Sequence, residues 1–252
     1  MNDLALIKAK INTLPVEDQK EMLDLIVELE EAKEREESRV DFLTFVRKMW
    51  PAFIGGKHHE IMADAFERVA NGELKRLIIN MPPRHTKSEF ASYLFPAWFL
   101  GRYPEKKIIQ TAHTAELAVG FGRKVRNLIG QDDFQSVFPG IELSADSKAA
   151  GRWNTNKRGD YFAIGVGGAV TGKGADVLII DDPHSEQEAA LGAYNAEVYE
   201  KTYEWYTSGP RQRLQPGGAI IIVMTRWSTR DLTGKIIKSV TQKEGVDEWE
   251  VI

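Results

Sequence analysis

The chain has 252 residues, 42% of them hydrophobic and 10% aromatic, which is enough for a substantial core and one large domain. It contains no cysteine, which excludes disulfides and thiolate metal sites. No apolar run is long enough to cross a bilayer, and no signal-peptide pattern opens the chain, so neither a membrane nor a secreted protein is expected. The net charge of −4 excludes a strongly basic nucleic-acid binder, although a local basic patch remains possible.

The negative charge is concentrated in the first 41 residues, which predict an acidic helical arm. Residues 1–41 hold 6 of the 33 Lys and Arg but 12 of the 37 Asp and Glu, which leaves residues 42–252 with a net charge of +2. This arm either docks on a partner or neighbouring subunit or is a solvated helix with internal ion pairs, and its composition favours the solvated helix. Its apolar residues recur at helical spacing: Met22, Leu25, Ile26 and Leu29.

Two short helices are expected next, over residues 41–54 and 60–71. The loop between them carries His58 and His59, upstream of a strand where many ATPases place a residue that contacts adenine. His59 is therefore a candidate nucleotide contact. Two adjacent histidines cannot both face one metal from a regular strand, so a metal is not predicted here.

The stretch from Leu77 to Ser88 predicts an apolar strand, a tight loop, and a Lys-Ser pair that opens a helix. This is the order of the P-loop, G-x-x-x-x-G-K-[ST], although Met81 and Thr86 stand where its two glycines would be. The ammonium of Lys87 would reach the terminal phosphates, and the Ser88 hydroxyl would bind Mg²⁺. Backbone N–H groups of the helix can cradle an anion without glycine. Taken alone, the loop favours a phosphate site and a plain strand-to-helix turn about equally.

Regular elements continue after the loop. Residues 87–100 predict a helix of core aromatic residues that Pro96 kinks or shortens. A strand over 107–112 precedes a helix that Thr114 caps and that runs to Ile129. Residues 130–160 are expected to be irregular, and residues 160–166 form a strand that leads into the glycine-rich stretch 167–174.

Two carboxylates follow the next apolar strand, at Asp181 and Asp182. Carboxylates at the carboxyl end of a parallel strand face the crevice where ligands bind. This is a Walker B pattern, in which Asp181 holds Mg²⁺ and Asp182 orients and activates the attacking water. Most sequences with this motif carry Glu at the second position, and Asp is one methylene shorter.

The remainder predicts one long helix over 185–208, a connector at Gly217 and Gly218, and a buried strand over 219–224. Thr225 and Arg226 follow that strand and either sense the γ-phosphate or simply mark where the strand reaches solvent. A helix over 231–240 and a strand from Trp249 complete the pattern. Because this last strand stops in mid-element, we expect a truncated chain.

Together these elements predict an α/β fold of the RecA-like (ASCE) P-loop NTPase kind, with a mostly parallel central sheet flanked by helices and an N-terminal helical arm. From about His58 to Ile237 the chain resembles the large terminase subunit of tailed bacteriophages. The resemblance rests on these stretches: 58–61 (HHEI), 82–88 (PPRHTKS), 95–98 (FPAW), 167–174, 178–183 and 225–227 (TRW).

The resemblance implies a Mg²⁺-dependent ATPase motor, with ATP as cofactor, that moves double-stranded DNA into a procapsid. It implies partners as well: the portal and procapsid, the small terminase subunit, and further copies of the chain in a ring. It places the protein in the host cell cytoplasm and outside the mature virion. Residues 1–41 would be the arm and residues 42–252 the ATPase domain, without the C-terminal nuclease domain of the family.

The resemblance also implies roles for individual residues. Arg84 corresponds to an arginine in the loop that contacts phosphate within its own subunit, and Thr225 and Arg226 fall on the motif that couples hydrolysis to movement. Lys173 occupies the place of a finger that reaches a neighbouring subunit's site. Lysine lacks the guanidinium fork, however, so other residues compete for that role: Arg123, Arg126, Arg152 and Arg158.

The expected nucleotide site combines both kinds of inference. ATP would bind along Pro83, Arg84, His85, Thr86, Lys87 and Ser88. Thr86 either slows hydrolysis, because its side chain stands where the backbone approaches phosphate, or is harmless if it keeps a negative φ. Two alternatives remain: a helicase-like translocase of the same fold with a finger in cis, and a module that binds nucleotide without hydrolysing it.

Overall fold

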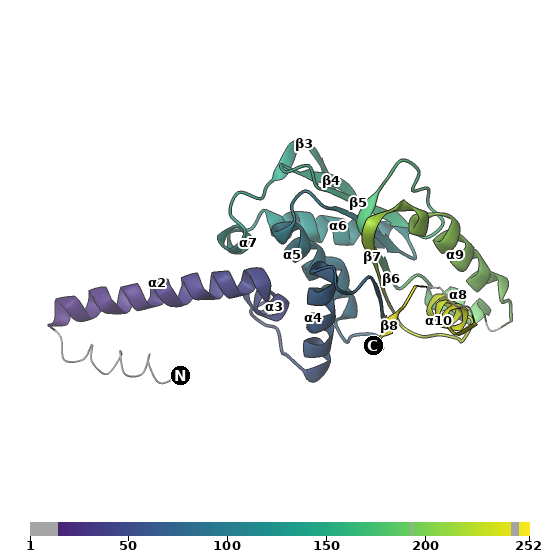
Figure 1. Cartoon of the computed structure of the whole chain (residues 1–252), viewed down its shortest axis with the longest axis horizontal. Helices are drawn as coiled ribbons and strands as arrows, with labels where there is room; N and C mark the ends of the chain where they lie inside the picture. The colour runs from purple at the N-terminus through teal and green to yellow at the C-terminus, as the bar shows by residue number, and fades with distance from the viewer. Residues whose placement is uncertain (1–14, 193, 243–246) are drawn as a thin grey trace.

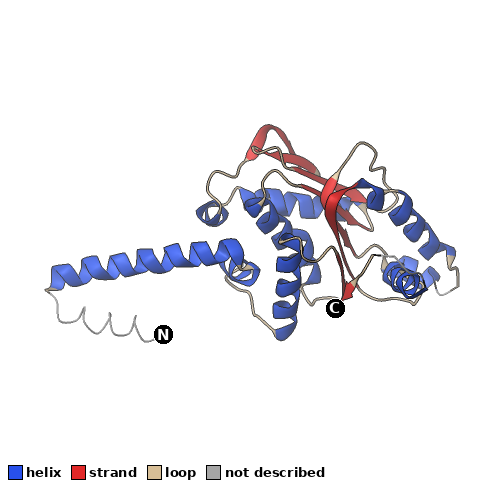
Figure 2. Ribbon diagram, in the orientation of Figure 1, coloured by secondary structure: helices blue, strands red, loops and turns tan. Residues whose placement is uncertain are grey.

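The computed structural model describes residues 15–192, 194–242 and 247–252, and contains one eight-stranded sheet with helices on both faces (Figures 1 and 2). The strand order is β3-β4-β5-β2-β6-β7-β1-β8. Every neighbouring pair from β5 to β8 is parallel, and β3 and β4 extend the sheet antiparallel. No helix in the described part of the chain is long and apolar enough to span a membrane. The predicted α/β fold with a mostly parallel sheet is confirmed.

The strands are β1 (Arg76–Asn80), β2 (Lys107–Ala112), β3 (Leu143–Ala149), β4 (Arg152–Thr155), β5 (Asp160–Gly165), β6 (Ala175–Asp181), β7 (Leu214–Met224) and β8 (Glu250–Val251). The helices are α2 (Val16–Val40), α3 (Phe42–Met49), α4 (Lys57–Ala70), the π-helical η1 (Glu89–Leu94), α5 (Phe95–Arg102), α6 (Ala115–Ile129), α7 (Asp132–Val137), α8 (Glu186–Gly192), α9 (Glu197–Ser208), the 3₁₀ turn η2 (Pro210–Arg213) and α10 (Leu232–Gln242).

The central strands are apolar on both sides because both faces of the sheet are covered. One face packs on α3 to α7 around an aromatic core, in which the ring of Phe42 lies 5.2 Å from that of Trp98 and 5.6 Å from that of Phe90. The other face packs on α9 and α10. The parallel strands all end at the same edge of the sheet. The segments that follow β1, β2, β6 and β7 therefore meet there, which is the usual place for a ligand site in such sheets.

The N-terminal helix α2 projects from this body (Figure 1). Its last turn packs on the body, where the Trp98 indole N–H donates to the Ser38 carbonyl (2.9 Å). Further out, Ile26 is buried but Leu25 and Leu29 are 48% and 60% exposed, so the spacing of apolar residues does not mark a continuous buried stripe. Pairs such as Lys33 with Glu37 (3.7 Å) run along the helix, as the solvated interpretation predicts. Residues 1–14 of the predicted arm lie outside the described residues.

The helix after the loop differs from its prediction. It opens at Lys87, widens into the π-helical η1, and becomes α-helical from Phe95. The N–H of Phe95 donates to the carbonyl of Phe90, five residues back. Pro96 has no N–H to donate, and it lies directly after the widened turn, where α5 begins. The proline is thus accommodated by a widened turn that the sequence did not predict.

Two further predictions are wrong. Residues 130–160 are not irregular, because they contain α7, β3 and β4, which are anchored by Trp153 stacked on Tyr161 at 4.7 Å. The single helix predicted over 185–208 is two helices. α8 ends at Gly192, where a Cβ would overlap the Tyr199 ring of α9.

The strand predicted over 219–224 begins earlier, at Leu214, so the expected glycine connector is part of β7. Gly217 has a φ of 79°, a left-handed conformation that glycine adopts without strain. The register with β6 shifts at this point, as in a β-bulge.

Candidate functional site

The loop after β1 is held at the carboxyl edge of the sheet in an unusual backbone conformation. The N–H of Met81 donates to the Met224 carbonyl of β7 (3.1 Å). Beyond it, Arg84 and Thr86 have positive φ angles of 64° and 61°, in the left-handed region that glycine favours. For β-branched Thr86 this conformation is a strained one. The condition that Thr86 keeps a negative φ is therefore not met.

A buried histidine holds Thr86 in that conformation. The N–H of Gly56 donates to Nδ1 of His59 (2.9 Å), so the ring proton is on Nε2, which donates to the Thr86 hydroxyl (2.7 Å). The hydroxyl in turn donates to the His85 carbonyl (2.6 Å). Burial, followed by the neighbouring imidazoles of His58 and His85, lowers the pKa of His59 and favours this neutral form. His59 therefore contacts the loop itself, and whether it also contacts a nucleotide stays a prediction.

Lys87 lies at the start of the helix with its ammonium pointing back across the sheet edge. Its Nζ is 2.9 Å from Oδ2 of Asp182 and 3.2 Å from the hydroxyl of Thr225. The Lys87 side chain is only 6% exposed, whereas that of Asp182 is 33% exposed. A buried ammonium requires a partner, and this carboxylate supplies it. The P-loop and Walker B patterns predicted that Lys87 and Asp182 share one site, and the fold brings the two side chains into contact.

Asp181 is buried beside that pair and is held by two serines. The Ser88 hydroxyl donates to its Oδ1 (2.9 Å), and the Ser92 hydroxyl donates to its Oδ2 (2.7 Å). Burial raises the pKa of Asp181 to about 7, and the charge of Asp182 adds to this effect, while the two serine hydrogen bonds and Lys87 oppose it. Without a cation, Asp181 therefore titrates near neutral pH.

The oxygen atoms of Ser88 and Asp181 suit Mg²⁺, which binds one or two protein oxygens and completes its shell with phosphate and water. The Ser88 hydroxyl and Oδ1 of Asp181 already face each other within hydrogen-bond distance, so one cation could contact both. Within the described ranges, no group of three or more His, Asp or Glu side chains forms a cation site. A nucleotide-dependent Mg²⁺ site fits this donor set, whereas a cage made only of protein side chains does not.

Thr225 joins the two strands that flank the site. Its N–H donates to Oδ1 of Asp182 (2.8 Å), and its hydroxyl donates to the Met81 carbonyl (3.2 Å). Asp182 itself has a φ of 38°, and its carbonyl lies 3.2 Å from Nδ1 of His113. The tip of β7 is therefore tied to the carboxylate that pairs with Lys87 and to the start of the loop.

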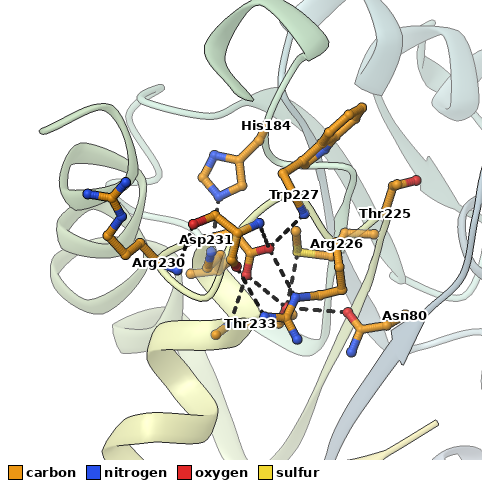
Figure 3. Close-up of polar contacts among 12 residues, drawn as sticks. Asn80, His184, Thr225, Arg226, Trp227, Arg230, Asp231 and Thr233 are labelled. Carbon is orange, nitrogen blue, oxygen red and sulfur yellow. Dashed lines mark hydrogen bonds and ion pairs between the residues drawn. The ribbon is translucent and has the colours of Figure 1, made fainter. Parts of the chain in front are cut away.

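Arg226 does not extend into the cleft, because a buried carboxylate holds it (Figure 3). Asp231, 0% exposed, accepts from Nε of Arg226 (3.0 Å) and from the backbone N–H groups of Trp227 (3.0 Å), Ser228 (3.0 Å) and Gly234 (2.8 Å). Burial alone raises the pKa of Asp231, but these donors outweigh it and lower the pKa below its ordinary value. The predicted phosphate contact of Arg226 would require this ion pair to open.

The same cluster reaches two other strand ends (Figure 3). The hydroxyl of Thr233 lies 3.3 Å from Oδ1 of Asn80, the last residue of β1. The N–H of Leu232 donates to Nε2 of His184, shortly after β6 (3.1 Å). The start of α10 is therefore fastened to the ends of β1, β6 and β7 together.

A cleft of about 740 Å³ lies at the amino ends of the strands, while a cleft of about 730 Å³ opens at the carboxyl edge. The second is lined by Asp182, Thr225 and His113 of the site described above, and its volume suits a small-molecule ligand. Exposed Arg84 and His85 flank it on the loop. Its lining residues are Pro83, His113, Thr114, Asp182, His184, Ser185, Glu186, Gln187, Glu188, Leu191, Thr225 and Trp227.

Lys173 lies away from this site. It precedes β6, at the opposite end of a strand that is about 20 Å long. Its ammonium pairs with Asp160 (3.0 Å) and lies 5.1 Å from the centre of the Phe162 ring. Within its own chain Lys173 is thus an ion-pair partner, and a finger role in a neighbouring subunit stays a prediction. The rival arginines Arg123, Arg152 and Arg158 are exposed, and Arg126 donates to Asn127 (3.1 Å).

Several residues of the site escaped the sequence reasoning, among them Ser92, Asp231 and Gln110, whose amide donates to the Ser92 hydroxyl (3.0 Å). Ser92 follows Ser88 by four residues in an apolar helix, and Gln110 is a single polar residue inside an apolar strand. Asp231 precedes a helix, where an N-cap residue is expected. Each pattern was visible, but nothing in the sequence indicated what these side chains face.

The fold and the site define a mostly parallel α/β protein whose charged side chains gather where the strands end. No family model matches the chain. The large terminase subunit of Enterobacteria phage T3 is 28% identical to it over 168 residues, which are 66% of this chain and 28% of that protein. The crystal structure of the HK97 bacteriophage large terminase overlaps 77% of this chain and 39% of its own, with a TM-score of 0.47 and 14% identity.

The chain is a homologue of bacteriophage large terminase subunits, as the sequence motifs predicted. The match spans less than a third of the length of the phage T3 protein.

Proposed function

We propose that this chain is the ATPase motor domain of a phage large terminase subunit and that it moves double-stranded DNA into a procapsid. One observation carries the proposal. Two adjacent residues of the loop helix, Lys87 and Ser88, contact two adjacent residues where β6 ends, Asp182 and Asp181. This is the arrangement that a triphosphate and its metal ion need at the edge of a parallel sheet.

In this proposal ATP binds along residues 83–88, and Ser88 and Asp181 hold Mg²⁺, which neutralises charge on the phosphates. The Lys87 ammonium leaves Asp182 and contacts the terminal phosphates. Asp182 is then free to orient a water for attack on the γ-phosphate. Its second oxygen remains bonded to the N–H of Thr225, which fixes its direction. A basic residue of a neighbouring subunit, Lys173 or a rival arginine, stabilises the developing charge.

The remaining assignments follow from the homology. The proposed partners are duplex DNA, the portal of the procapsid, the small terminase subunit and further copies of the chain in a ring. They would meet in the host cell cytoplasm. The motor would contact the DNA phosphates without recognising the base sequence. Its binding to DNA should therefore weaken steeply as the salt concentration rises. Residues 1–41 would be an arm and residues 42–252 the motor domain.

The test is steady-state ATP hydrolysis as a function of protein concentration, with Asp182→Ala measured beside the wild-type chain. Specific activity that rises with assembly and is lost in Asp182→Ala supports a motor with a finger in trans. Activity that is independent of concentration favours the helicase-like alternative, in which the finger is in cis. ATP binding without hydrolysis at any concentration, also on procapsids, would establish the non-hydrolysing alternative.

A further inference from the structure

The carboxylate of Asp181 is held from both sides by the helix that follows the loop. Ser88 donates to Oδ1 (2.9 Å) and Ser92, one turn later, donates to Oδ2 (2.7 Å). Ser92 is 0% exposed and Asp181 is 2% exposed. Only the Ser88 side of the carboxylate therefore faces the loop, and the Ser92 side is enclosed in the protein.

The direction of the Ser92 hydroxyl is set by a third buried side chain. Nε2 of Gln110, on β2, donates to Oγ of Ser92 (3.0 Å) and to the Thr111 carbonyl (3.3 Å). The reverse orientation of this amide would set its oxygen against that carbonyl, so the assigned orientation is the favourable one. A hydroxyl has a single proton. Because Oγ of Ser92 accepts from Gln110, its proton is available for Asp181.

We propose that Ser92 is a positioning residue for Mg²⁺: by bonding one oxygen of Asp181, it aims the other at the cation that Ser88 also contacts. This inference rests on the proposed function, since it assumes that Asp181 and Ser88 hold the metal of a bound nucleotide. Gln110 supports it by fixing the Ser92 hydroxyl. Without Ser92, the Asp181 carboxylate is free to rotate and loses the orientation that the metal requires.

Calorimetric titration of ADP in excess Mg²⁺ and again in EDTA tests the inference without relying on turnover. The measured quantity is the gain in ADP affinity that Mg²⁺ produces. For Ser92→Ala we expect this gain to fall by about 10-fold to 100-fold, the usual effect of losing an outer-shell ligand partner. Affinity in EDTA should stay at the wild-type value. Ser88→Ala provides the reference for loss of a direct ligand.

Two more variants keep the test decisive even if Ser92→Ala folds poorly. Gln110→Leu leaves the serine in place but frees its hydroxyl, so a smaller loss of the Mg²⁺-dependent gain is expected. Thr111→Val is the matched control. It removes a buried hydroxyl from the neighbouring position on β2 that has no hydrogen-bond partner among the described residues, so it should keep the full gain.

The inference is overturned if Ser92→Ala and Gln110→Leu keep the wild-type gain. Equal losses of affinity in Mg²⁺ and in EDTA would overturn it too, because they would show a purely structural role. If the wild-type chain binds neither ADP nor ATP under either condition, the proposed function fails as well. The two failures are therefore distinguishable.

Discussion

The ammonium of Lys87 lies 2.9 Å from a carboxylate oxygen of Asp182, and the other oxygen of that carboxylate accepts from the N–H of Thr225. The lysine expected to bind phosphate is thus already neutralised by the carboxylate expected to activate water. In the proposed function, nucleotide and Asp182 would compete for the same ammonium. Binding of the nucleotide would free the carboxylate for its own task.

This competition predicts opposite effects of Asp182→Asn on binding and turnover. With the negative charge removed, Lys87 is available to the phosphates, so ATP should bind several-fold more tightly than to the wild-type chain. Turnover should fall by about 100-fold or more, because the group that orients and deprotonates water is lost. Equilibrium titration and single-turnover hydrolysis measure the two effects separately. Weaker ATP binding by Asp182→Asn would contradict the competition.

The strained loop predicts an order of stability among variants of Thr86. Thr86→Ser keeps the hydroxyl that His59 contacts and removes the β-branch, so it should match or exceed the wild-type free energy of unfolding. Thr86→Gly relaxes the positive φ, a relief of about 1 kcal/mol. It also leaves the buried Nε2–H of His59 unpaired, at a cost of about 1–3 kcal/mol. Urea unfolding should therefore rank Ser above Gly, and the reverse order would mean that backbone strain outweighs the hydrogen bond.

Asp231→Asn should be strongly destabilising at neutral pH, by about 3 kcal/mol, since it removes a buried charge that pairs with the half-exposed Arg226 and that accepts several backbone hydrogen bonds. The pKa of Asp231 is lowered in the folded protein, so its stabilising effect is complete above its unfolded value of 3.8 and is lost as pH falls through the lower folded value. The stability gap between wild type and variant should be constant from pH 6 to 8 and narrow at acid pH. Urea unfolding from acid pH to pH 8 measures this gap. A gap that widens in acid would contradict the lowered pKa of Asp231.

The raised pKa of Asp181 predicts the opposite pH dependence of the free energy of unfolding. Its folded pKa of about 7 exceeds the ordinary 3.8, so its contribution to stability is most favourable below 3.8 and falls as pH rises to about 7. Asp181→Asn mimics the protonated acid, so the variant does not lose stability as pH rises through this range. In EDTA the variant should therefore gain stability over the wild type between pH 5 and 8, on the order of 1 kcal/mol per pH unit up to about 7. Thermal unfolding of both proteins at pH 5 and at pH 8 measures this difference. A stability advantage of Asp181→Asn that shrinks as pH rises would refute the prediction.

Several parts of the fold were predictable because the sequence pattern had one physical solution. The apolar strands that end in Asn80, Asp181 and Met224 could only be buried on both faces, and parallel strands place their ends together. Thr114 was correctly assigned as an N-cap, since its side chain accepts from the N–H of Leu117 (3.2 Å). The pairings of Lys87 with Asp182 and of Ser88 with Asp181 follow from these placements.

Other features depend on tertiary contacts that no local pattern encodes. The positive φ of Thr86 depends on His59, which lies 27 residues earlier in the chain. Composition made residues 130–160 look irregular, whereas the packing of Trp153 on Tyr161 decides their structure. Arg226 matched a motif, but its orientation is set by Asp231, whose role depends on the path of the loop between them.

The way β8 joins the sheet has a practical consequence for anyone who handles this protein. The N–H of Ile252 donates to the Ile78 carbonyl (2.9 Å), and the carbonyl of Ile252 accepts from the N–H of Asn80 (2.8 Å). Ile252 is thereby fixed beside the end of β1, directly before the loop of residues 81–88. An affinity tag or fluorescent fusion joined after Ile252 would emerge next to the start of that loop. Activity lost in such a fusion should be blamed on the tag until a cleaved sample has been assayed.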